Sequence, residues 1–156
     1  MFTYRKCGEK DAELWTKLNR EFIAYENQDD DLWNGVSQVS DKRFAKTFEE
    51  ALAAPELISL LLFEEDGRPV GFANLMIIFS VWSHGRAIYL DDLFIREEHR
   101  RKGYGKKALE YIEDYAKELG YRRLQFHSES TNPAARDFYA SQGYHPAEMY
   151  FYVKYF

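Results

Sequence analysis

The sequence predicts a mixed α/β fold, with a mostly antiparallel central sheet and flanking helices. Three apolar runs, residues 57–63, 70–79 and 87–95, follow one another in the middle of the chain with short turn segments between them. Helical periodicity precedes these runs and returns after them. A fourth short run then follows the second helical region, and a strand that follows a crossover helix lies parallel to its predecessor.

The N-terminal third is expected to form one strand and two helices. Residues 2–6 alternate aromatic and polar side chains, which is typical of a strand. Residues 11–25 repeat apolar side chains at helical spacing on one face: Leu14, Leu18, Phe22 and Tyr25. Residues 41–54 are expected to form the second helix, which Pro55 would end.

The three central strands are expected to form an antiparallel meander. Asp66-Gly67 lies between the first two runs, and this dipeptide is typical of a tight hairpin turn. Ser83-His84-Gly85-Arg86 separates the second run from the third. The sequence therefore predicts two consecutive hairpins in the middle of the chain.

The C-terminal half adds helices and strands. Residues 107–119 are expected to be a helix that Gly120 ends, with these residues facing inward: Leu109, Ile112, Ala116 and Leu119. Residues 124–127 would then form the strand parallel to 87–95. The aromatic tail, residues 149–156, is expected to be a strand buried on both faces or paired with another subunit.

Composition predicts one soluble domain over residues 1–156. Apolar content of 46% and charged content of 30% are ordinary for a globular protein. No apolar run approaches the ~20 residues of a membrane span, and the N-terminus lacks a signal-peptide pattern. Cys7 is the single cysteine and cannot form an internal disulfide. We therefore expect a cytoplasmic protein without a membrane partner.

The most distinctive segment lies between the strand 87–95 and the helix 107–119. It reads Arg100-Arg101-Lys102-Gly103-Tyr104-Gly105-Lys106. Amides at a helix start have no intrahelical acceptor and the helix dipole adds partial positive charge, so a basic turn there suits phosphate. The glycines permit positive φ and leave the backbone open to a ligand. We expect the segment to bind a pyrophosphate.

Other phosphate-binding motifs fit the segment less well. A Walker-type loop needs Ser or Thr after Gly-Lys, but Lys107 follows Gly105-Lys106. A dinucleotide fingerprint needs three glycines, and the segment has two. The alternatives are a nucleic-acid patch, which the net charge of −5 disfavours, and a glycine turn with solvated charges. The histidines lack a metal-ligand spacing. The sequence thus favours a metal-free site without a nucleic-acid partner.

Two motifs in this order resemble the GCN5-related N-acetyltransferase (GNAT) family. Arg100-x-x-Gly103-x-Gly105 is similar to the family's Arg/Gln-x-x-Gly-x-Gly/Ala signature. Residues 132–139, Asn-Pro-Ala-Ala-Arg-Asp-Phe-Tyr, resemble its Asn-x-x-Ala-x-x-Phe-Tyr segment, and Gly143-Tyr144 matches the continuation. The resemblance implies the GNAT (acyl-CoA N-acyltransferase) fold, in which parallel strands splay apart at the cofactor site. It also implies acetyl-CoA as cosubstrate and no metal.

The resemblance further implies which residues bind acetyl-CoA. Backbone groups at the end of the strand 87–95 would pair with the pantetheine arm, and the basic segment would bind the pyrophosphate. Asn132 would hydrogen-bond the pantetheine arm or cap its own helix, with Pro133 at the first helical position. The expected cofactor-binding residues are Leu93, Phe94, Ile95, Arg100, Arg101, Lys102, Gly103, Tyr104, Gly105, Lys106, Asn132, Ala135 and Tyr139.

Acetyl transfer to an amine needs a neutral amine, a stabilised carbonyl oxygen and a proton for the leaving thiolate. Residues 90–95 resemble the Leu-Glu-Asp-Phe/Leu-Phe-Val segment of polyamine acetyltransferases, whose first acid serves the amine through water. Asp91 is therefore the first candidate and Asp92 the second. They point to opposite faces in a regular strand, and a bulge would change which one reaches the substrate. The alternative is that one acid caps or pairs while the other is solvated.

Tyr139 matches the tyrosine with which the family protonates the coenzyme A sulfur. A phenol with an ordinary pKa near ~10 stays protonated at neutral pH and can donate to a thiolate, whose thiol pKa is near ~8.5. The alternative is a buried tyrosine that packs behind Phe138. For an oxyanion donor, the sequence offers only an unassigned backbone amide near Leu93.

The acceptor is expected to be a small cationic amine. Residues 26–31 are acidic and would attract a polyamine, an aminoglycoside or a similar amine, unless they form a solvated turn. Trp33 and Trp82 would line the acceptor site or simply pack. We expect an acetyl-CoA-dependent N-acetyltransferase that acts by direct attack in a ternary complex, as a homodimer. The alternatives are a protein or peptide N-acetyltransferase and a non-catalytic acyl-CoA-binding sensor.

Overall fold

The computed structural model describes residues 1–26 and 38–156. The acidic residues beyond Glu26 that were assigned to acceptor attraction, and Trp33, lie outside the described residues. The chain divides into two compact units, residues 1–126 and 127–156. The first unit holds the central sheet, and the second holds the last helix and the aromatic tail.

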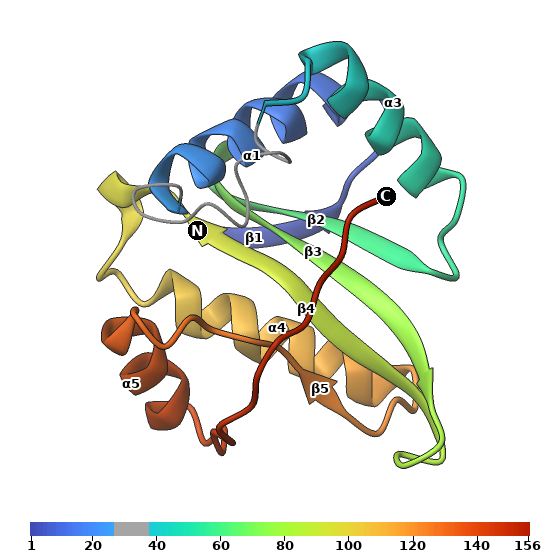
Figure 1. Cartoon of the computed structure of the whole chain (residues 1–156). Coiled ribbons are helices and arrows are strands. Elements are labelled where there is room, and N and C mark those ends of the chain that lie inside the picture. The colour runs from blue at the N-terminus through green and yellow to red at the C-terminus, as the bar shows by residue number, and fades with distance from the viewer. Residues whose placement is uncertain (27–37) are drawn as a thin grey trace. The chain divides into compact units, whose positions relative to one another are not determined.

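The first unit is built on a sheet that has, among the described residues, five strands in the order β1-β2-β3-β4-β5 (Figure 1). The strands are β1 (Phe2–Lys6), β2 (Ile58–Glu65), β3 (Arg68–Ser80), β4 (Gly85–Ile95) and β5 (Leu124–Gln125). Pairs from β1 to β4 are antiparallel, and β5 pairs with β4 in parallel. The predicted mixed, mostly antiparallel α/β sheet is confirmed, including the central meander.

The turn between β2 and β3 follows from its sequence. Asp66 and Gly67 both have positive φ, 50° and 74°. A tight turn of this hand matches the twist of the two strands, and Gly adopts it without a steric penalty. The predicted hairpin at Asp66-Gly67 is confirmed.

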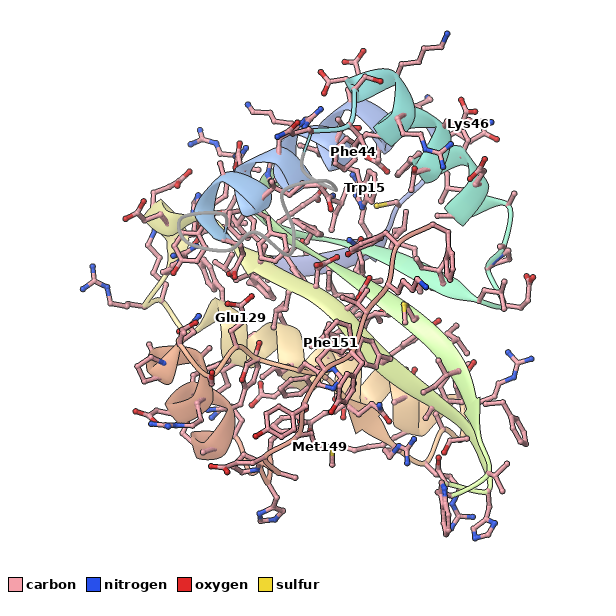
Figure 2. All side chains as sticks on the ribbon, in the orientation of Figure 1. Trp15, Phe44, Lys46, Glu129, Met149 and Phe151 are labelled. Atoms are coloured by element: carbon pink, nitrogen blue, oxygen red, sulfur yellow. The ribbon has the colours of Figure 1, made fainter. Side chains whose placement is uncertain are left out.

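Two helices cover one face of the sheet, α1 (Ala12–Glu26) and α3 (Asp41–Leu52), and Figure 1 shows α4 (Tyr104–Glu118) on the opposite face. A short 3₁₀ turn, η1 (Glu9–Asp11), precedes α1. Trp15 of α1 packs on Phe44 and Phe48 of α3, with ring centroids 6.1 and 5.5 Å away; Trp15 and Phe44 are labelled in Figure 2. A second buried cluster joins α1 to the sheet through Leu18, Leu62, Phe72 and Phe94.

Helix α4 (Tyr104–Glu118) begins three residues before the predicted start at Lys107. Gly103 is its N-cap in the left-handed conformation, and Tyr104 is buried on the sheet. Gly105 and Lys106 therefore belong to the first helical turn. Leu119, predicted to face inward, is 47% exposed because it lies past the last helical residue as the C-cap. A 3₁₀ turn, η2 (Glu97–His99), links β4 to this region.

The second unit contains α5 (Pro133–Ser141). Asn132 caps it, since the Ala135 amide donates to Asn132 Oδ1 over 3.1 Å, and Pro133 is the first helical residue, as predicted. The expectation that residues 149–156 form a strand buried on both faces is wrong: the structure assigns no strand there, and Tyr150 and Tyr152 are almost fully exposed. Pairing of this tail with another subunit stays a prediction. A strand needs a partner for its backbone groups, and none of the described strands pairs with the tail.

Candidate active site

Strand β4 carries a β-bulge at the two predicted carboxylates. Leu75 of β3 lies opposite Leu90, and the next β3 residue, Asn74, lies opposite Asp92. Asp91 is therefore the extra residue of β4 in the described register. A bulge locally increases the twist and redirects side chains, so the regular alternation does not decide which acid faces which side of the sheet.

Asp92 faces the side chain of Asn74, whose Nδ2 donates to Asp92 Oδ2 over 2.7 Å. The pKa of Asp92 is raised to about 6, first by burial and then by the charges of Asp91 and Glu26, while the hydrogen bond from Asn74 works in the opposite direction. Asp92 Oδ1 has no hydrogen-bond partner among the described residues. A carboxyl with a pKa near neutrality and one free oxygen suits proton transfer.

Asp91 differs from Asp92 in its surroundings. Its side chain reaches solvent, although partial burial of the carboxyl raises its pKa above the ordinary value. Tyr89, two residues earlier, has its pKa raised by burial and by both carboxylates, so the three groups lie near one another. The structure thus brings the two candidate acids together and gives them different degrees of burial.

The basic segment forms a turn whose amides are open. Arg101 and Gly103 have positive φ, 60° and 78°, and no described heavy atom outside Gly103 and its two chain neighbours lies within 4 Å of a Cβ placed on Gly103. The first bond into α4 is donated by Lys107 to the Gly103 carbonyl over 3.1 Å. The amides of residues 101–106 have no acceptor among the described residues. Such amides at a helix start can bind an anion.

Arg100, predicted to bind the cofactor, has its side chain held elsewhere. Its Nε donates to the Ile95 carbonyl over 2.9 Å. Its guanidinium lies 4.0 Å from the ring centroid of Tyr25 in α1 and 5.7 Å from that of Phe94. Arg101 and Lys102 are exposed at the turn, and Lys106 is exposed in the first turn of α4, where its Nζ lies 3.8 Å from Glu110.

Side chains of α1 and β2 bond the segment that runs from the end of β4 to the start of α4. Arg96 makes two bonds to the carboxylate of Glu21 in α1, over 2.8 and 2.7 Å. The Tyr104 hydroxyl donates to Glu65 at the end of β2. His99 Nδ1 lies 3.5 Å from the other carboxylate oxygen of Glu65. The start of α4 is therefore attached to two other elements of the first unit.

The end of β4 offers a strand edge. Its pairing with β5 covers Ile88↔Leu124 and Tyr89↔Gln125, and β4 continues to Ile95. Residues 93–95 pair on the other side with β3, opposite Ala73, Phe72 and Gly71. Within the described part of the first unit, no strand pairs with the second edge of residues 93–95. The backbone there resembles a sheet edge that can accept an extended ligand.

Three predicted site residues lie in the second unit: Asn132, Ala135 and Tyr139. Asn132 and Ala135 are joined by the helix cap. The Tyr139 ring lies 5.3 Å from that of Phe138 and 6.3 Å from that of Tyr144, and its side chain is half-buried. Trp82, considered for the acceptor site, is 90% exposed in the turn before Gly85. Gly85, where β4 begins, is seven residues and about 23 Å along the strand from Asp92.

Asn74, Asn19 and Trp15 were not predicted as site residues, yet Asn74 bonds Asp92, and Trp15 and Asn19 bond Asn74. One signal was available, because Asn74 is an isolated amide in the otherwise apolar run 70–79. Among the residues that the structure describes, no group of three or more His, Cys, Asp or Glu side chains is placed to bind a metal. No helix in the described ranges is long and apolar enough to cross a lipid bilayer.

Comparison with known sequences adds an independent finding to this geometry. Residues 14–144 match the profile of the acetyltransferase (GNAT) family. The chain belongs to the GNAT family. It is an acyltransferase domain with the fold that the two motifs implied, and the strand, bulge and turn described above lie within the matched residues.

Relatives of this GNAT chain include three N-acetyltransferases. An uncharacterized N-acetyltransferase of Bacillus subtilis is 36% identical over 107 residues, which cover 69% of this chain and 72% of the relative. The D-amino-acid N-acetyltransferase of Saccharomyces cerevisiae is 27% identical and covers 86% of this chain and 80% of its own. The thialysine N-ε-acetyltransferase of Bos taurus is 28% identical, with 89% and 81% covered.

Solved structures agree on the GNAT fold. An aminoglycoside acetyltransferase from a soil metagenome superposes with a TM-score of 0.79 at 18% identity, over 99% of this chain and 96% of that one. A predicted acetyltransferase from Clostridium acetobutylicum, solved with acetyl-CoA, superposes with a TM-score of 0.77 at 19% identity, with 99% and 96% covered. At such identities the likeness shows the fold.

Proposed function

We propose that this GNAT chain is an acetyl-CoA-dependent N-acetyltransferase that moves an acetyl group to a primary amine of a small cationic acceptor. One observation carries the proposal: open amides at the start of α4 directly follow a strand whose edge is free and whose bulge bears two carboxylates. This arrangement offers an anion site, an extended ligand track and a proton acceptor on one continuous stretch of chain.

The turn at the start of α4 is proposed to bind the pyrophosphate of acetyl-CoA. The amides of Gly103, Tyr104 and Gly105 would donate to its oxygens, and the exposed Arg101 and Lys102 would add charge. Backbone groups of residues 93–95 would pair with the amides of the pantetheine arm. A predicted acetyltransferase of the same fold has been solved with acetyl-CoA, which supports this cosubstrate.

A cationic acceptor is supported by charge. The charges of Asp91 and Glu26 both raise the pKa of Asp92, so each of these two acids lies within electrostatic range of Asp92. The relatives named for D-amino acids and thialysine act on amines, and a structural neighbour is an aminoglycoside acetyltransferase. We infer an acceptor that carries a second positive charge besides the amine that reacts, as polyamines and aminoglycosides do.

The proposed chemistry is direct attack in a ternary complex. The amine nitrogen attacks the thioester carbonyl carbon, a C–N bond forms and the C–S bond breaks. Asp92 or Asp91 receives the proton that the amine loses, directly or through a water molecule. Tyr139 donates its phenolic proton to the departing sulfur, so both proton transfers have a named partner.

A coenzyme-release assay with a panel of amines tests the proposal. We expect acetyl-CoA to release free thiol in the presence of diamines or aminoglycosides at micromolar to millimolar KM. Mass spectrometry of the acceptor should show one added acetyl group. Tight binding of acetyl-CoA without thiol release from any amine would instead identify a sensor, and activity confined to peptides would identify a peptide acetyltransferase.

A further inference from the structure

The Asn74 side chain lies in the middle of β3 and is 5% exposed. It faces α1, and all of its polar hydrogens and its oxygen have partners. Asn74 Oδ1 accepts from Trp15 Nε1 over 3.0 Å, and Asn74 Nδ2 donates to Asp92 over 2.7 Å and to Asn19 Oδ1 over 3.3 Å. A buried amide costs free energy unless it is satisfied, and this one is satisfied on three sides.

The orientation of the Asn74 amide follows from chemistry. The indole N–H of Trp15 can only donate, so the group that faces it must be the Asn74 oxygen. The Asn74 NH₂ group then faces Asp92 and Asn19. Asn19 is fixed in turn, because its Nδ2 donates to the Trp15 carbonyl over 2.8 Å. A helix of the core thus determines which end of Asn74 faces the carboxylate.

We propose that Asn74 is a positioning residue for acetyl transfer, which holds the Asp92 carboxylate at the β4 bulge through an amide that Trp15 and Asn19 keep in one orientation. The inference rests on the proposed function and deepens it. Asn74 occupies one oxygen of Asp92 and leaves Oδ1 for the amine or a bridging water. It also selects Asp92, the second candidate from the sequence, over Asp91 as the group with a built support.

The groups that face Asp92 have opposing effects on its ionisation. Asp91 beside it in β4 and Glu26 at the end of α1 disfavour its charge, and the phenol of Tyr89 lies near both β4 acids. Asn74 favours the ionised form. Without this donor, nothing opposes the effects of burial and of the two like charges, so the pKa of Asp92 must rise. As the pH falls, the ionised form of Asp92 is then lost at a higher pH than in the wild type.

Asn74→Leu removes the donor and replaces the amide with an apolar side chain of similar size. We expect the acidic limb of the kcat–pH profile to move up by about one pH unit. Turnover should then fall about tenfold at pH 5.5 and less than about twofold at pH 7.5, with little change in the KM for acetyl-CoA. A structural defect alone would lower turnover by the same factor at every pH.

Trp15→Phe provides a second variant if Asn74→Leu fails to fold. It keeps an aromatic side chain and removes the N–H that orients Asn74, so the acidic limb of the kcat–pH profile should move in the same direction by a smaller amount. Ser59→Ala is the matched control: Ser59 is a buried polar residue of β2, 6% exposed, whose hydroxyl has no hydrogen-bond partner among the described residues. Its profile should match the wild type.

A measurement independent of activity separates this inference from the proposed function. Carboxyl ¹³C chemical shifts followed through a pH titration by NMR report the ionisation of Asp92 even if every amine proves inactive. A higher Asp92 midpoint in Asn74→Leu, or in Trp15→Phe, supports the inference. An unchanged midpoint in a folded variant, or a kcat–pH limb that stays in place, overturns it.

Discussion

At the scale of single residues, Asp92 is the group on which the account depends most. Its side chain is half-buried, the charges of two other acids act on it, and its pKa is raised to about 6. Keeping this carboxylate ionised in the folded chain costs free energy, which lowers the stability of the fold. An acid whose pKa is higher in the folded than in the unfolded chain binds more protons when folded, so stability falls as pH rises between about 4 and 6.

Asp92→Asn should therefore change stability in a pH-dependent way. Above about pH 6 the variant should be more stable than wild type by about 1–2 kcal/mol, and near pH 4 the difference should vanish. Urea denaturation at pH 4 and pH 8 measures this. Asp114→Asn, which neutralises an exposed acid of α4, serves as the control and should show no such trend. Equal differences at both pH values would contradict the raised pKa.

Tyr139→Phe tests the proposed acid in the second unit. We expect kcat to fall by about 10–100-fold because the thiolate loses its proton donor, while the Kd for acetyl-CoA changes little. Stopped-flow thiol release and calorimetric titration measure the two quantities. Tyr152→Phe, in the exposed tail, is the matched control. Full turnover in Tyr139→Phe would remove this residue from the mechanism.

The two acids of the site could be predicted from the sequence, whereas the bulge that carries them and the role of Asn74 could not. Asp91 and Asp92 stand out as adjacent acids at the end of an apolar run, but the bulge depends on the pairing of β3 with β4, which one strand alone does not encode. The role of Asn74 depends on α1, which is 55 residues away at Asn19. Long-range contacts of this kind leave only an isolated polar residue in a strand as a signal.

At the scale of elements, α4 and the turn before it carry the proposed anion site. Gly103→Val should lower acetyl-CoA affinity by at least about 100-fold, because a branched side chain would occupy the space in which the phosphate oxygens accept hydrogen bonds from the backbone amides. Its φ of 78° adds backbone strain. Fluorescence or calorimetric titration gives the affinity.

Gly120→Val is the matched control for this change. Gly120 ends the same helix with φ 71°, and a Cβ there also meets no described atom within 4 Å. Both variants should lose a similar amount of stability, about 1–2 kcal/mol, through the left-handed conformation. Affinity should fall in Gly103→Val alone; an equal loss in both variants would assign the effect to strain.

Element boundaries were predictable where local signals are strong. The hairpin at Asp66-Gly67 and the cap at Asn132 follow from turn and capping chemistry. The start of α4 was missed by three residues. The helix begins at Tyr104, whose side chain is buried, and burial of this side chain is a tertiary contact that local sequence does not reveal. The tail was predicted as a strand from its apolar content, which cannot say whether a partner strand exists.

At the scale of the whole molecule, the net charge of −5 favours cationic acceptors. The KM for a diamine should rise several-fold between about 0.05 and 0.5 M salt, because the Debye length shrinks from roughly 14 to 4 Å. A monoamine of equal length should respond less. Initial rates at several ionic strengths decide this, and identical salt dependence for both amines would argue against long-range attraction.

The homodimer and the single domain over residues 1–156 stay predictions at this scale. Light scattering after size-exclusion chromatography gives the molar mass, which is 18.5 kDa for one chain. Limited proteolysis should show whether residues 127–156 are released as a separate unit. The exposed aromatic tail is the part of the chain whose surroundings a dimer would change most.

A crystal structure with acetyl-CoA bound tests the central claim most directly. We expect the pyrophosphate oxygens to lie about 3 Å from the amides of Gly103, Tyr104 and Gly105, with the pantetheine arm along residues 93–95. Density for the nucleotide at another place on the chain, or an empty turn at a saturating concentration, would contradict it.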